Sequence, residues 1–98
     1  MNTKEGLVQN IANEMLQIRI INKVTYEINH SNMAIPLLLI NVFSTSIVSD
    51  LNITNINSIL KKYHQELTTE FANYECIVYE NMHPVVISNK SNKIKITP

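Results

Sequence analysis

The sequence predicts an α+β fold in which two helices pack on one face of a mainly antiparallel, five-stranded sheet. Three observations indicate this class: two amphipathic helical patterns, several short strand patterns, and connections of hairpin length between neighbouring strands. The predicted element order is α-β-β-α-β-β-β. The 98 residues suit one domain, which we expect to span residues 1–98.

The first helix is predicted over residues 3–16. Its apolar side chains recur three or four positions apart, which places them on one helical face. They are Leu7, Val8, Ile11, Ala12, Met15 and Leu16. Asn2 or Thr3 can cap the N-terminus, and Glu5 carries the charge that the helix dipole favours there.

Two strands are predicted next, over residues 18–28 and 33–43, joined by a turn at residues 29–32. The first alternates apolar and polar residues, and Asn22 interrupts the alternation in the manner of a bulge or a polar contact. The second is a continuous apolar run, which suits a strand covered on both faces. A buried helix that begins at Pro36 is the alternative interpretation.

The strongest helical pattern covers residues 53–71. Its apolar stripe consists of Ile53, Ile56, Leu60, Tyr63, Leu67 and Phe71. Asn52 or Thr54 is the expected cap. Lysines, glutamine and glutamates occupy the other face, so the stripe is expected to pack on the sheet.

Three further strands are predicted over residues 74–80, 85–88 and 93–97, separated by polar turns. Ile94 and Ile96 are expected to point inward. Lysines in the last strand are typical of a sheet edge that resists pairing with other chains. Because the chain has one glycine, we expect asparagine to occupy turn positions with positive φ.

The composition excludes several kinds of site. One glycine cannot build a phosphate-binding loop, one cysteine cannot form an internal disulfide, and one aspartate cannot supply a calcium loop. We therefore expect no cofactor. A net charge of zero argues against a nucleic-acid binder, because such proteins usually carry a basic surplus.

The apolar run at residues 34–43 is too short to span a bilayer, and the N-terminus lacks the pattern of a signal peptide. A cytoplasmic location is expected; an extracytoplasmic one remains open if the chain is an excised domain of a larger protein. The abundance of asparagine, isoleucine and lysine is typical of AT-rich coding DNA, as in an AT-rich bacterium or phage.

The candidates for catalysis are sparse. Cys76 with His64 or His83 could supply a nucleophile and a base, but a buried structural cysteine is the plainer interpretation. The three histidines lack the spacing of metal ligands, and no two glutamates converge in the sequence pattern. We therefore expect a protein that is not an enzyme and that holds no metal.

Two helices can cover only one face of the predicted sheet, so the other face should remain apolar and uncovered. The candidates for a partner interface are Ile21, Leu38, Ile40, Tyr74, Ile77 and Tyr79. Low charge and zero net charge favour self-association. The leading hypothesis is a non-enzymatic protein–protein interaction module: an adaptor, an inhibitor, or a chaperone-like assembly factor that binds another protein or a second copy of itself.

The alternative hypothesis is a small regulatory domain that senses an apolar ligand. The ligand would occupy a space between helix and sheet lined by Ile20, Ile56, Leu60 and Tyr63. The two hypotheses place the functional surface on opposite faces of the sheet.

Overall fold

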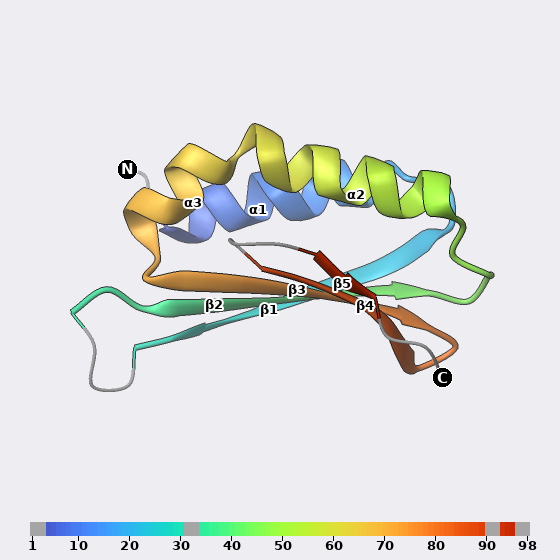
Figure 1. The fold of residues 1–98 in the computed structure, drawn as a ribbon. Coiled ribbons are helices and arrows are strands. Elements are labelled where there is room, and N and C mark those ends of the chain that lie inside the picture. Colours follow the sequence, from blue (N-terminus) through green and yellow to red (C-terminus); the bar gives the residue numbers. More distant parts are fainter. Residues whose placement is uncertain (1–3, 31–33, 90–92, 96–98) are drawn as a thin grey trace.

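The computed structural model describes residues 4–30, 34–89 and 93–95, with backbone alone at residues 89 and 93–95. Helices and strands follow one another along the described chain as α1 (Lys4–Met15), β1 (Ile21–Asn29), β2 (Leu37–Ser44), α2 (Asp50–Lys62), α3 (His64–Glu70), β3 (Asn73–Glu80), β4 (His83–Asn89) and β5 (Lys93–Lys95). The sheet has the order β1-β2-β3-β4-β5. Figure 1 shows all three helices of the described chain on one side of the sheet. The predicted α+β class is confirmed.

One detail of the predicted sheet is wrong: its centre is a parallel pair. β1 with β2, β3 with β4, and β4 with β5 are antiparallel, but β2 and β3 run parallel. The reason is the connection between them. The chain leaves β2, crosses the sheet through α2 and α3, and begins β3 at the same end at which β2 began, as a helical crossover requires.

The predicted long helix is divided into α2 and α3 at Tyr63, so the sheet carries three helices and not two. Tyr63 has φ −101° and ψ 8°, outside the helical range, and it ends one helix and precedes the next. Its hydroxyl donates a hydrogen bond to the Glu14 carboxylate of α1. The apolar stripe continues through the break, so the periodicity of the sequence carries no sign of it.

The N-cap of α2 is Ser49, so the prediction of Asn52 or Thr54 is wrong. The Ser49 hydroxyl accepts from the Asn52 backbone N–H at 3.2 Å, and the Asn52 side chain accepts from the Ser49 N–H at 3.0 Å. This reciprocal pair is a capping box in which asparagine takes the place of the usual glutamate. The predicted caps of α1, Asn2 and Thr3, lie outside the described residues.

Of the two interpretations of Asn22, a bulge or a polar contact, the structure favours the bulge, because the register between β1 and β2 shifts between Ile21 and Lys23. The strand begins at Ile21, three residues later than predicted, since two turn hydrogen bonds occupy the preceding segment: Ile18 N–H to Met15 O and Ile21 N–H to Ile18 O, each 3.0 Å. A bulge adds one residue and reverses the alternation of side chains. Ile21 is therefore buried with Val24 and Tyr26 on the helix side of the sheet.

The hydrophobic core fills the space between the helices and the inner face of the sheet. Its fully buried large side chains are Phe71, Ile11, Met15, Ile40, Ile56 and Leu67, with Val8, Val42, Val78 and Val86 between them. Every helix and each of the first four strands contributes to this core cluster. The inner face of the sheet is thus fully used for folding.

The β3–β4 hairpin turns at Asn81 and Met82, with φ of 51° and 70°. The expectation that asparagine takes a positive-φ position is confirmed at Asn81. Met82 is unexpected, because a residue with a Cβ atom pays a steric penalty there. The predicted inward orientation of Ile94 and Ile96 lies outside what the described residues show.

Candidate interaction surface

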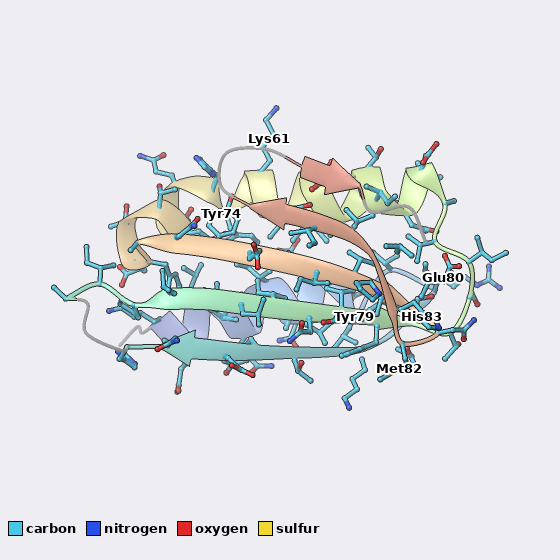
Figure 2. The ribbon with its side chains drawn as sticks, turned by 60° about the horizontal axis from the view of Figure 1, so that its bottom comes forward. Lys61, Tyr74, Tyr79, Glu80, Met82 and His83 are labelled. Carbon is cyan, nitrogen blue, oxygen red and sulfur yellow. The ribbon has the colours of Figure 1, made fainter. Side chains whose placement is uncertain are left out.

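Side chains in the sheet alternate between the helix-covered face and a second face that the helices of the described chain leave uncovered. The alternation is clearest in β2, whose residues are half-buried and buried in turn along the whole strand. Figure 2 is turned so that the uncovered side comes forward, with the helices behind the strands. We call this side the open face.

The strand register places the open-face residues in rows that cross the sheet. One row contains Glu27, Leu39 and Glu75; the next contains Thr25, Asn41, Ile77 and Ile87; the third contains Lys23, Phe43 and Tyr79. Leu37 lies one row beyond Leu39, towards the start of β2. The open face therefore carries mainly apolar side chains on β2, β3 and β4, with Asn41 and Glu75 among them, and polar side chains along β1.

The apolar part of the open face consists of six half-buried side chains: Leu37, Leu39, Phe43, Ile77, Tyr79 and Ile87. None of them belongs to the core cluster or to the partly buried apolar side chains that pack against it. A cluster of apolar side chains on the outside of a folded chain commonly marks an interaction site.

Two aromatic rings on the open face pack against each other. Phe43 and Tyr79 are stacked, with ring centroids 4.8 Å apart and planes inclined at 23°. The Tyr79 hydroxyl donates to the Asn41 side-chain oxygen at 3.2 Å. The Lys23 ammonium lies 5.5 Å from the centroid of Phe43, so the open face holds a cation at one end of β1.

The six residues predicted for the partner interface lie on two different faces of the sheet. Ile77 and Tyr79 lie on the open face. Placing the other four there is wrong, because they are buried beneath the helices with exposures of 5% or less: Ile21, Leu38, Ile40 and Tyr74. The bulge reverses the parity of Ile21, and the apolar run of β2 presents leucine or isoleucine on both faces, so composition alone cannot distinguish them.

Four open-face residues were missed: Leu37, Leu39, Phe43 and Ile87. One signal could have identified the three in β2. Asn41 is the polar residue in the middle of that strand, and residues two apart share a face. Leu37, Leu39 and Phe43 have the parity of Asn41, and a half-exposed asparagine marks the side that faces water.

The four residues predicted to line a ligand site are not gathered around one described cavity. Ile56 and Leu60 belong to the packed core cluster, and Ile20 and Tyr63 pack against it from outside. Tyr63 does line a groove of about 780 Å³, but the other lining residues come from α1 and α3: Gly6, Leu7, Asn10, Gln65, Glu66, Thr69 and Glu70. This groove opens between helices, and its lining mixes polar side chains with Gly6, Leu7 and Tyr63.

Beside this groove, Glu14, Lys62 and Tyr63 form a polar cluster that joins α1 to α2. The Tyr63 hydroxyl donates to Glu14, and the Lys62 ammonium lies 2.9 Å from the same carboxylate. Both hydrogen bonds lower the pKa of Glu14, and the bond from Tyr63 has the larger effect. The cluster links Glu14 of α1 to Lys62 and Tyr63 at the end of α2.

Cys76 is completely buried in β3, and this burial raises the pKa of its thiol to about 12. A neutral thiol without access to solvent is a poor nucleophile. His64 is occupied elsewhere, with its Nδ1 2.9 Å from the Tyr74 hydroxyl, and His83 is exposed where β4 begins. The structure therefore favours the interpretation of Cys76 as a structural residue.

In the part of the chain that the structure describes, no group of three or more histidine, cysteine, aspartate and glutamate side chains is arranged to hold a metal ion. Across the same residues, no helix has the length and apolarity needed to cross a bilayer.

Comparisons with known proteins found no relative of this chain. No family model matches the chain, and searches of curated proteins and of solved structures likewise returned no significant match.

Proposed function

We propose that this protein is a non-enzymatic interaction module that docks a partner protein on its open face. The observation that carries the proposal is the uncovered apolar surface at the centre of the sheet, formed by β2, β3 and β4 opposite the helices. Central strands usually have both faces covered when both are apolar. Here the helices supply one cover, and a partner would supply the other.

The dimensions of the molecule leave room for a protein interface of standard size. The chain measures 37 × 25 × 20 Å, and the open face extends along the two longer dimensions. The bounding rectangle of the whole molecule in these two directions, about 900 Å², is an upper limit for the open face, and a standard protein interface buries roughly 800 Å² on each partner. Interfaces of this kind commonly combine apolar and aromatic contacts with a polar rim; on the open face Phe43 and Tyr79 supply aromatic contacts, and Lys23, Thr25 and Glu27 of β1 supply a polar rim.

The chemistry of the surface favours a protein over a lipid membrane or a nucleic acid. Glu27 and Glu75 flank Leu39 in one row, and Asn41 lies at the centre of the face. Two carboxylates repel phosphate groups, and a half-exposed asparagine requires hydrogen-bonding partners that hydrocarbon lacks. The roles that fit such a surface are those of an adaptor, an inhibitor or an assembly factor.

Site-specific photo-crosslinking in host cells tests the proposal. A benzophenone amino acid replaces Tyr79 on the open face, and in a matched variant it replaces Lys61, which is exposed on the opposite side of the molecule (Figure 2). We expect protein adducts from position 79 at least several-fold above those from position 61. Equal yields from the two positions would count against the open face as a docking surface.

A further inference from the structure

We propose that the occupant of the open face is a second copy of this chain, packed face to face about a two-fold axis that crosses the strands over Thr25 and Ile77. This inference rests on the proposed function and adds to it the identity and orientation of the partner. The strands of the two sheets then run antiparallel, and each strand lies over its own counterpart.

Charge complementarity along β1 is the first argument. Lys23 and Glu27 lie on the open face at equal distances on either side of Thr25. Rotation about the proposed axis exchanges their two rows, so Lys23 meets Glu27 of the partner subunit, and the pair occurs twice. Packed sheets are about 10 Å apart, a gap that an extended lysine and glutamate together can bridge.

The apolar rows match under the same rotation. Leu39 of one copy lies over Phe43 of the partner subunit, and Ile77 lies over its own counterpart on the axis. Glu75 lies over the ring of Tyr79 of the partner subunit, and Asn41, which accepts from the Tyr79 hydroxyl of its own chain, lies over its own counterpart on the axis. The arrangement therefore places Leu39 on Phe43, Ile77 on Ile77, and the Lys23 ammonium beside the Glu27 carboxylate.

A second two-fold arrangement, with its axis along β2, is unfavourable. An axis that runs along β2 leaves each row over itself and places β1 of one copy over β3 of the other. Glu27 would then face Glu75 of the partner subunit, because both residues occupy the row of Leu39. Like charges directly opposite each other destabilise a contact, so the face discriminates against this packing.

The charge of the whole chain permits such pairing. Its formal net charge is zero, so two copies approach without long-range repulsion. The charges on the open face then select the orientation. The open face carries no large excess of one charge, so its charges do not call for a strongly charged partner.

A charge-exchange experiment tests the pairing. The variants Lys23→Glu and Glu27→Lys each place like charges opposite one another twice, and the double variant restores opposite charges. Both side chains are exposed, so the fold should persist, and circular dichroism checks this for each variant. We expect each single variant to dissociate at about tenfold or more higher concentration than the original chain, as measured by sedimentation equilibrium.

Mixing the two single variants tests the Lys23–Glu27 pairing directly, and an Ile77→Lys variant separates face-to-face packing from pairing of the β1 edges. One of the two mixed variants carries two glutamates on β1 and the other two lysines, so the mixture is expected to form a heterodimer of near-original affinity. Single variants that dimerise like the original chain, or a mixture and a double variant that stay monomeric, would overturn the pairing. A monomeric original chain that still gives crosslinks from position 79 to a different protein would overturn self-pairing and leave the proposed function standing.

Discussion

Replacing Ile77 with lysine is expected to abolish association through the open face while the chain remains folded. Ile77 is half-buried and does not belong to the core cluster, so in a single chain a lysine ammonium at this position reaches water. In the pair, the two-fold axis brings two such ammonium groups together between the sheets. Buried charges without partners cost several kcal/mol, so the dissociation constant should rise more than about 100-fold.

Ile47→Lys is the matched control, because it makes the same chemical change at a side chain that is 80% exposed in the loop before α2. It should leave the dissociation constant unchanged. Sedimentation equilibrium measures both variants against the mass of 11.2 kDa for one chain. An Ile77→Lys variant that remains dimeric would locate the contact elsewhere, for example at the edge strand β1, where antiparallel pairing could also bring Lys23 to Glu27.

Replacing Phe71 with alanine is expected to have the largest effect on stability. Phe71 follows α3 and is 1% exposed in the core cluster between the helices and the sheet. Truncating a buried phenylalanine removes apolar contacts and leaves a cavity, which costs about 3–5 kcal/mol of the free energy of unfolding. Since small domains have only about 5–15 kcal/mol in total, this variant should be barely folded.

Phe43→Ala provides the paired comparison, since the same ring is removed from the open face. It loses the stacking contact with Tyr79 but leaves no cavity in the core, so the single chain should lose about 1 kcal/mol. Its association should weaken far more than its folding. Urea unfolding at a protein concentration below the dissociation constant measures the folding cost of each variant. Equal losses for Phe43→Ala and Phe71→Ala would contradict the division into core and open face.

The elements were largely predictable, because their apolar spacing is a local property. The α1 stripe and the bulge at Asn22 illustrate this: each follows from residues within one turn of helix or one stretch of strand. The parallel pairing of β2 with β3 and the break at Tyr63 are different. The first depends on the path of a crossover, and the second coincides with a hydrogen bond from Tyr63 to Glu14, which lies on a helix far away in the sequence.

The existence of an uncovered apolar face was predictable from the sequence, but only some of the residues on it were. That the helices leave one sheet face uncovered follows from counting elements. The side chains that occupy it depend on strand parity, and the apolar run of β2 gives no contrast between Leu38 and Leu39. Only the parity of Asn41, or the register with Ile77 in β3, separates the two faces. A single bulge reversed the assignment for Ile21.

The central claim is that the open face is covered by a second copy of the chain, and nuclear magnetic resonance tests it most directly. A mixture of isotope-labelled and unlabelled chains, measured at a concentration where the dimer predominates, reports contacts between copies through isotope-filtered nuclear Overhauser effects. We expect such contacts from the methyl groups of Leu39 and Ile77 to the partner subunit, including a contact from Leu39 to the Phe43 ring. Intermolecular contacts confined to the helices or to the outer edge of β1, or none from the open face, would contradict the claim.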